Sequence, residues 1–359
     1  MMKKHNFGAG PCILPPSVFE KAAESVLNFE ESGLSILEIS HRSEAFVSVF
    51  ESARSLVLEL MELSPNSHTV LFLHGGASLQ FSMVPENFLT RAAAYSDTGV
   101  WSQKAIEEAK KVGIVDILYD GSIDGYKKTP DLKLLKESLQ SGHDYLHLTT
   151  NNTIYGTQYP SFESFPKPLV VDMSSDIFSC QRSYETFDLI YAGAQKNIGP
   201  AGTTLVVIKN EFLEQLSPRI KFSLLDYQKH IKAESMYNTP SVFAVYTSLL
   251  NLKWLKAQGL SEIARRNSEK ATLLYEAIDH SDLFEGFADK KNRSQMNITF
   301  TIANSSVAKR FESLCEEAGI VGIKGHRLVG GYRASMYNAL SKESVETLVE
   351  VIKYTESNA

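Results

Sequence analysis

The sequence has few cysteines, no long hydrophobic run and no excess of positive charge. Its three cysteines, Cys12, Cys180 and Cys315, form no CxxC pair, so neither a disulfide framework nor a zinc site is indicated. No apolar stretch approaches the ~18 residues of a membrane span. The two lysines near the N-terminus are not followed by the apolar segment of a secretory signal. These absences favour a reducing, cytoplasmic location.

Acidic residues outnumber basic ones in this chain. The 359 residues include 36 Lys and Arg against 42 Asp and Glu, which gives a net charge of −6. A nucleic acid or an anionic membrane would on average repel such a protein, although a small anion can still bind where positive groups converge. With 43% hydrophobic and 22% charged residues the chain has the composition of a globular protein, and its length fits about two domains.

Apolar runs rich in Val, Ile and Leu alternate with helical patterns between about residues 68 and 210. This alternation predicts an α/β fold with a mostly parallel central sheet flanked by helices. The predicted strands are 69–73, 114–119, 145–148, 169–173, 189–192 and 203–208, and the predicted helices are 78–89, 103–111 and 131–140. Such a sheet binds its ligand beyond the carboxyl ends of its strands.

From residue 241 the pattern changes to long helices followed by two more strands. The predicted helices are 241–257, 261–280, 307–319 and 342–354, and the predicted strands are 296–302 and 332–337. This arrangement is typical of a smaller α+β domain. We predict a large α/β domain over residues 16–260 and a small α+β domain over 261–359, with residues 1–15 packing on the small one.

An aspartate and a lysine follow two consecutive predicted strands. Asp172 ends the apolar run 168–171, and Lys196 lies 24 residues later in a glycine-flanked turn. Alone, Asp172 would more often be a helix cap, and a single loop lysine is usually a surface charge. Together they are the pair expected for pyridoxal phosphate, because the lysine forms the Schiff base and the aspartate pairs with the pyridinium nitrogen.

A glycine turn offers a place for the phosphate of that cofactor. His74-Gly75-Gly76-Ala77-Ser78 joins a predicted strand to a helix, where free N–H groups and the helix dipole attract phosphate. Turns of this kind are common, so the signal is weak by itself. The chain lacks both GxGxxG and GxxxxGK[ST], which argues against a nucleotide fingerprint. Trp101 is as consistent with core packing as with stacking on a cofactor ring.

Two short basic segments stand out in this acidic chain. Ser40-His41-Arg42-Ser43 is one, and residues 322–333, with His326, Arg327 and Arg333, are the other. Each taken singly is more often an exposed loop, but guanidinium groups are the usual binders of carboxylates and phosphates. Asn238 and Thr239 precede a long helix, where Thr239 is either its N-cap or, with Asn238, a phosphate donor.

These residues taken together resemble the phosphoserine aminotransferase family, within the fold-type I, class V pyridoxal-phosphate enzymes. The likeness runs over nearly the whole chain. The motifs that carry it are Asn6-Phe-Gly-Ala-Gly-Pro11, Ser40-His-Arg-Ser43, Trp101-Ser102, Asn152-Thr-Ile154, Asp172-Met-Ser-Ser175, Tyr191-Ala-Gly-Ala-Gln-Lys-Asn-Ile-Gly-Pro200, Tyr237-Asn-Thr-Pro-Ser241 and Gly325-His-Arg327 through Asn338. The first and the last of these are specific to this family.

The resemblance implies a reversible transamination of O-phospho-L-serine with 2-oxoglutarate, giving 3-phosphohydroxypyruvate and L-glutamate. This reaction serves L-serine biosynthesis, and some members also act on 4-phosphohydroxy-L-threonine in pyridoxine biosynthesis. Family members are homodimers with active sites at the subunit interface.

The resemblance also implies site roles, motif by motif. Lys196 is the Schiff-base lysine, and Asp172 is the partner of the pyridinium nitrogen. The other cofactor-binding residues are Trp101 on the ring, Thr153 at its 3-hydroxyl, Ala77, Ser78 and Gln195 at the phosphate, and Asn238 and Thr239 from the neighbouring subunit. The substrate-binding residues are Arg333 for the α-carboxylate and His41, Arg42, His326 and Arg327 for the phosphate or the distal carboxylate. No metal site is expected.

The chain departs from the family pattern at one position of the phosphate cup. Many members have arginine where this chain has Ser78, so the cofactor phosphate has fewer positive partners here. The role of Tyr155, in a segment that varies, is left open.

Other functions remain open from sequence. An aminotransferase acting on serine or alanine and glyoxylate is the nearest alternative, but its substrates lack a phosphate and leave His326 and Arg327 without purpose. A cysteine desulfurase needs a cysteine in a mobile glycine-rich loop. From another class, the chain could be a nicotinamide oxidoreductase or a non-catalytic binding protein on a similar sheet, and the missing GxGxxG argues against the oxidoreductase.

Overall fold

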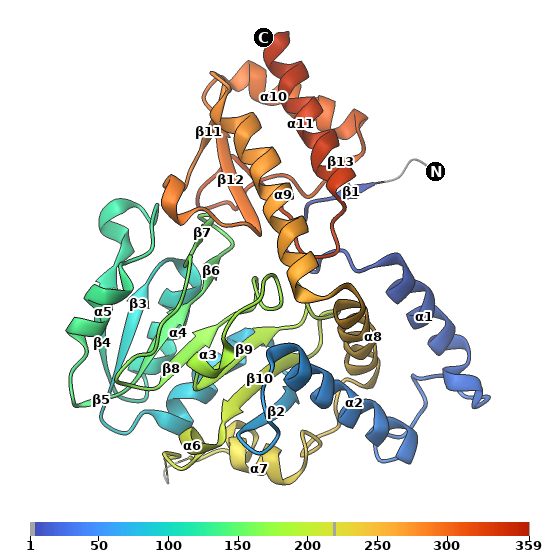
Figure 1. Ribbon diagram of the computed structural model, residues 1–359, viewed down its shortest axis with the longest axis vertical. Helices are drawn as coiled ribbons and strands as arrows, with labels where there is room; N and C mark the ends of the chain where they lie inside the picture. The colour runs from blue at the N-terminus through green and yellow to red at the C-terminus, as the bar shows by residue number, and fades with distance from the viewer. Residues whose placement is uncertain (1–3, 218–219, 359) are drawn as a thin grey trace.

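The computed structural model, which describes residues 4–217 and 220–358, is built on a seven-stranded sheet (Figure 1). The strand order is β2-β10-β9-β8-β5-β3-β4. The strands are β2 (His68–Leu73), β3 (Ala92–Asp97), β4 (Ile114–Asp120), β5 (His143–Thr149), β8 (Leu169–Asp172), β9 (Leu189–Gly193) and β10 (Thr204–Lys209). In this sheet β10 alone runs opposite to the other six strands, so the prediction of a mostly parallel sheet is confirmed.

Helices cover both faces of the sheet because its strands are apolar on both sides. Val70 and Phe72 of β2 share a hydrophobic core with α2 and α8, while Leu71 and Leu73 belong to a second core with α3 and α4. This alternation is what a strand buried on both faces requires. The helices around the sheet are α1 (Pro16–Leu27), α2 (Glu44–Met61), α3 (Gly76–Phe88), α4 (Val100–Lys110), α5 (Leu132–Ser138), α6 (Asn210–Leu213), α7 (Tyr227–Lys232) and α8 (Val242–Gln258).

Strand β3 is the central element that the sequence pattern did not predict. Its sequence, Ala-Ala-Ala-Tyr-Ser-Asp, is rich in alanine and lacks the β-branched residues that favour strands. It nevertheless lies between β4 and β5, and its Ala93 and Tyr95 share a hydrophobic core with α4. Tertiary packing overrides the weak local propensity here.

The C-terminal region, from α9 onward, has its own sheet and its own hydrophobic core. Its elements are α9 (Leu260–Asp279), β11 (Phe284–Gly286), β12 (Asn297–Ile302), α10 (Ser305–Glu317), β13 (Ile320–Val321), β14 (Tyr332–Ser335) and α11 (Lys342–Ser357). The N-terminal strand β1 (His5–Asn6) pairs with β13, and Phe7 is buried in this core. Figure 1 shows this region above the central sheet, joined to it through α8 and α9.

The fold brings the C-terminal region to the carboxyl ends of the parallel strands. The small hairpin β6 (Asn151–Asn152) and β7 (Thr157–Gln158) follows β5 and contacts β12, because Asn151 Nδ2 donates to Asn297 Oδ1 at 2.8 Å. No helix within residues 4–217 and 220–358 is long and apolar enough to cross a membrane. The C-terminal region thus contacts the segment that follows β5 at the carboxyl ends of the strands.

Candidate active site

A cavity of about 290 Å³ lies at the carboxyl ends of the parallel strands. Its walls come from the starts of α3 and α4, the turns after β8 and β9, and two residues of the C-terminal region. The cavity is lined by Ala9, Gly10, Gly76, Ala77, Ser78, Phe81, Trp101, Thr149, Asn151, Thr153, Asp172, Ser174, Ser175, Gln195, Lys196, His326 and Arg333. The sequence argument required Asp172 and Lys196 to share one crevice, and both line this one.

Asp172 and Lys196 face the cavity from neighbouring parallel strands. Asp172 is the last residue of β8 and pairs in register with Tyr191 of β9, and Lys196 follows the end of β9. The Asp172 Oδ1 accepts a hydrogen bond from the backbone N–H of Ser174 at 2.9 Å. The Ser174 side chain also donates to this carboxylate, and the Lys196 charge acts on it from the neighbouring turn. Space for a ligand remains between the two groups.

Burial shifts both pKa values toward the neutral forms. Burial raises the pKa of Asp172, while the nearby Lys196 charge acts in the opposite direction. Burial lowers the pKa of Lys196, and the Asp172 charge again opposes the shift. A lysine with a lowered pKa has a larger fraction of free amine, which is the form that reacts with a carbonyl and accepts a proton.

The start of α3 forms one end of the cavity. Gly75 has φ +86, and a Cβ there would lie 2.5 Å from the Cβ of Leu79, so this position requires glycine. Gly76, Ala77 and Ser78 make the first turn of α3, where backbone N–H groups have no helical partner. This helix is 13 residues long, and its positive dipole end points to the cavity.

Trp101 forms one wall beside Lys196. Its Nε1 donates to Thr153 Oγ1 at 2.9 Å, and the Lys196 Nζ lies 5.8 Å from the ring centroid. The turn before it is tightly packed, since a Cβ on Gly99 would lie 2.1 Å from the Asn152 Nδ2. Trp101 is thus held in place by both neighbouring turns. Tyr155 packs instead against Tyr126 and Phe287, with ring centroids 4.7 and 5.8 Å away.

Positive groups gather at the mouth of the cavity. The Arg333 Nη1 donates to the Thr153 carbonyl at 2.9 Å, and its buried Nε has no partner among the described residues. Burial lowers the pKa of His326, and the charges of Arg333, Arg327 and Lys104 lower it further. Lys104, which the sequence argument missed, places its Nζ 5.1 Å from the Trp101 ring centroid. The sequence could have indicated this lysine, because it follows Trp101 by one helical turn on α4 and therefore lies on the same face of the helix.

The N-terminal segment packs against the turn that carries Lys196. The Cys12 thiol donates to the Lys196 carbonyl at 2.5 Å, and the Cys12 N–H donates to the Gln195 carbonyl at 3.1 Å. Burial raises the pKa of Cys12 to about 12, so the thiol is a hydrogen-bond donor and not a nucleophile here. Sequence analysis did not identify this contact, because it joins residues 184 positions apart.

Five predicted site residues do not line this cavity within one chain: His41, Arg42, Asn238, Thr239 and Arg327. His41 and Arg42 lie in the turn before α2, and Arg42 is exposed. The Thr239 carbonyl accepts from the His74 Nε2 at 2.8 Å, so Thr239 lies beside the turn before α3. Arg327 is exposed next to His326.

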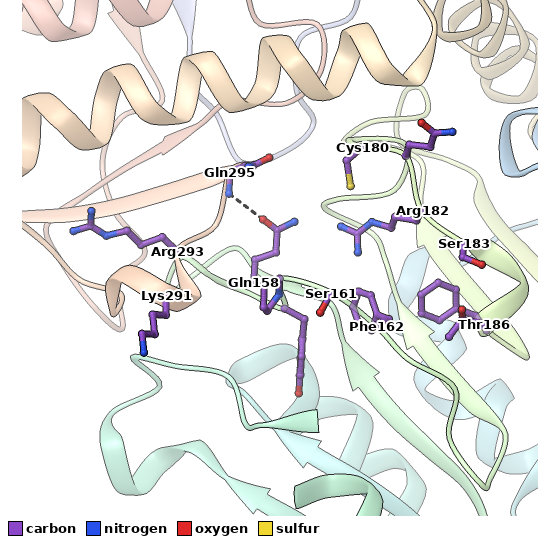
Figure 2. Close-up of a pocket in the computed structure, with 14 residues that line it drawn as sticks. Gln158, Ser161, Phe162, Cys180, Arg182, Ser183, Thr186, Lys291, Arg293 and Gln295 are labelled. Carbon is purple, nitrogen blue, oxygen red and sulfur yellow. Dashed lines mark hydrogen bonds between the residues drawn. The ribbon is translucent and has the colours of Figure 1, made fainter. Parts of the chain in front are cut away.

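A second and larger cavity, of about 510 Å³, contains none of the predicted site residues. Figure 2 shows Gln158, Arg182 and Cys180 turned into it, and the backbone N–H of Gln295 donating to Gln158 Oε1 at 3.0 Å. Both arginines that line it are already paired, because Arg182 contacts Asp176 at 2.6 Å and Arg293 contacts Asp279 at 2.7 Å. We therefore assign the chemistry to the smaller cavity.

The residues of the smaller cavity fit pyridoxal phosphate. The aromatic cofactor needs a stacking partner for its ring, a carboxylate for its ring nitrogen and a lysine amine for its aldehyde. Trp101, Asp172 and Lys196 supply these three features. The exposed N–H groups at the start of α3 suit the phosphate.

The fold and the site define a pyridoxal-phosphate-dependent aminotransferase, and the comparisons with known proteins agree. The model of the family "Aminotransferase class-V" matches residues 5–348, so the chain belongs to that family and uses its cofactor, pyridoxal phosphate. Within it, the chain belongs with the phosphoserine aminotransferases. It is 54% identical to the phosphoserine aminotransferase of Flavobacterium psychrophilum, over 99% of each chain.

Two solved structures support this placement. The phosphoserine aminotransferase from Bacillus circulans subsp. alkalophilus is 40% identical over 99% of both chains, with a TM-score of 0.95. The PLP-bound phosphoserine aminotransferase from Trichomonas vaginalis is 34% identical, with a TM-score of 0.91, over 98% of this chain and 100% of that one.

Proposed function

We propose that this chain transfers the amino group of O-phospho-L-serine to 2-oxoglutarate, giving 3-phosphohydroxypyruvate and L-glutamate, and runs the reverse reaction in L-serine biosynthesis. The observation that carries the proposal is the cavity itself, in which Lys196 faces Asp172 while Arg333 and His326 stand at the mouth. A lysine opposite a carboxylate suits transamination, and the basic mouth suits substrates with two anionic ends. The same reasoning extends to 4-phosphohydroxy-L-threonine in pyridoxine biosynthesis.

Lys196 moves the proton in this proposal. Pyridoxal phosphate, when bound, supplies the electron sink that makes the substrate Cα proton acidic. The Lys196 amine takes that proton from Cα and returns one during the reverse half-reaction, and burial favours its free-base form. Asp172 would stabilise positive charge on the ring nitrogen, because a carboxylate and a neighbouring cation favour each other's charged forms.

We assign the remaining site residues on the same basis. The cofactor would contact Trp101 on its ring, Thr153 at its hydroxyl and Ala77, Ser78 and Gln195 at its phosphate, all of which line the cavity. Arg333 would bind the substrate α-carboxylate. His326 and Arg327 would bind the distal phosphate or carboxylate.

A second copy of the chain is part of this proposal. Asn238, Thr239, His41 and Arg42 lie outside the cavity of their own chain, so we propose that they reach the site of the other subunit of a homodimer.

We also propose that residues 16–260 and 261–359 form two domains, with residues 1–15 on the second. Three free cysteines, Cys12, Cys180 and Cys315, support a cytoplasmic location.

A coupled assay that compares phosphoserine with serine tests the function. We expect kcat/KM for phosphoserine to exceed that for serine by at least about 100-fold, because serine leaves the basic groups at the mouth unpaired. The purified protein should be yellow, and borohydride should attach the cofactor to Lys196, as peptide mass spectrometry will show. Equal use of serine would favour the glyoxylate-type aminotransferase. A colourless protein that pyridoxal phosphate does not reconstitute would rule out both.

Removing His326 and Arg327 separates the two aminotransferase hypotheses further. In the H326A/R327A variant we expect KM for phosphoserine to rise about 10- to 100-fold while kcat stays within about threefold, because these groups bind the phosphate away from the reacting bond. Steady-state kinetics on both substrates measures this. K324A is the matched control, since Lys324 lies in the same segment but pairs with Glu312 at 3.1 Å. An unchanged KM in the double variant contradicts the assignment.

A further inference from the structure

Two buried polar residues of α9 connect the C-terminal region to the catalytic turns. Asn267 and Lys270 lie one turn apart on the helix and are 0% and 1% exposed. The Lys270 Nζ donates to the carbonyls of Met336, Tyr337 and Leu340 at 3.2, 3.0 and 3.1 Å. No carboxylate in residues 4–217 and 220–358 lies within ion-pair distance of it. Burial without a counter-ion lowers the pKa of Lys270 to about 7. Three backbone carbonyls take the place of a carboxylate, so this lysine ties α9 to the 336–340 segment.

The 336–340 segment contacts the turn after Asp172 and the turn that carries Lys196. The Asn338 N–H donates to Asn197 Oδ1 at 3.1 Å, directly beside Lys196. The Asn338 Nδ2 donates to the Phe178 carbonyl at 3.0 Å, in the turn that follows Asp172. One residue therefore touches both turns.

Asn267 completes the connection. Its Nδ2 donates to Asn338 Oδ1 at 2.8 Å and to the Ser179 carbonyl at 2.9 Å. The Asn338 side chain thus accepts a hydrogen bond from α9 through its Oδ1 and donates one through its Nδ2 to the turn after Asp172. Every one of these groups is buried, so water does not replace a lost hydrogen bond at low cost.

Strand pairing alone does not fix the two reactive side chains relative to each other. The register of β8 and β9 sets the Cα positions up to Asp172, but Lys196 lies beyond the end of β9, in a turn. A misplacement of about 1 Å in a reacting group costs up to about 100-fold in rate. The same C-terminal segment also follows β14, which carries Arg333.

We propose that Asn338 is a positioning residue, held in place by Asn267 and Lys270. It fixes the position of Lys196 relative to Asp172, and it links the turns that carry both residues to β14, which carries Arg333. It acts through the two turns and touches neither substrate nor cofactor. The proposal rests on the proposed function, because it assumes that Lys196 and Asp172 are the reacting pair.

The test uses holoenzyme of the N338A variant, with N304A as control. Asn304 also lies in the C-terminal region, where its side chain caps α10 by accepting from Ser306 and Val307. We expect N338A to lower kcat about 10- to 100-fold with KM for phosphoserine within about threefold. The pH midpoint of the absorbance change of the Lys196-bound cofactor should also shift. N304A should lower the melting temperature and leave kcat and the midpoint unchanged.

The outcomes separate this proposal from the proposed function. Wild-type enzyme that is yellow and active on phosphoserine, together with an N338A variant of unchanged kcat and midpoint, overturns the positioning role alone. Wild-type protein without activity or bound cofactor overturns the proposed function. If N338A does not fold, N267A gives the decisive measurement, because it removes the donor to Asn338 and Ser179 and leaves Asn338 in place; wild-type kcat and midpoint in N267A also overturn the role.

Discussion

Replacing Lys196 with alanine is expected to lower the transamination rate by at least about 1,000-fold. The substitution removes the amine that binds the cofactor covalently and moves the Cα proton, and general acid–base transfer alone contributes about 10²–10⁴-fold. Steady-state kinetics with phosphoserine, and the loss of borohydride fixation, measure the effect. The fold should survive, because burial already disfavours the charged form of this lysine.

The control for this variant is K209A. Lys209 ends β10 and pairs with Glu211 at 3.7 Å. Because β10 is antiparallel to β2 and β9, its last residue lies at the opposite edge of the sheet from Lys196. K209A should retain wild-type activity and colour. A K196A variant that keeps more than a tenth of the wild-type kcat contradicts the assignment of the lysine.

The D172N variant is expected to have the second-largest effect, a fall in kcat of about 100- to 1,000-fold, comparable to removing one electrostatic stabiliser of a transition state. Asparagine has a similar shape but carries no charge, so positive charge at the ring nitrogen loses its partner. Cofactor binding should weaken as well, which equilibrium dialysis of the holoenzyme measures.

D188N serves as the matched control for D172N. Asp188 precedes β9 and accepts from the backbone N–H of Leu169 at 2.8 Å, at the amino end of the same two strands. Burial raises the pKa of Asp188 as it does that of Asp172. D188N should alter stability and leave kcat and cofactor affinity near wild type. Similar kinetics in both variants would argue that Asp172 has only a structural role.

The sequence predicted the sheet well where strands are rich in Val, Ile and Leu. The predicted strands 69–73 and 189–192 correspond to β2 and β9 within one residue at each end. It failed at β3, whose alanine-rich sequence has no strand signal of its own. This strand forms because it is paired on both sides, by β4 and β5, and buries five of its six residues.

The residues of the candidate site also fall into those that local sequence indicates and those that only the fold brings to the site. Sequence alone placed Lys196 and Asp172 after apolar runs and found the glycine turn before α3, because each signal is local. It missed Cys12, Lys104 and Asn338, whose relation to the site depends on contacts across the fold. The resemblance to a known family carried the remaining assignments.

The order of residue types along the chain therefore determined which groups are available: a lysine and an aspartate after strands, a glycine turn and a basic C-terminal segment. Only the tertiary structure decided that β8 and β9 are neighbours, and that Arg333 reaches a cavity formed by residues more than a hundred positions earlier. The physical reason is that local sequence fixes backbone preference and burial pattern, whereas strand pairing and contacts between distant segments are decided by the packing free energy of the whole chain.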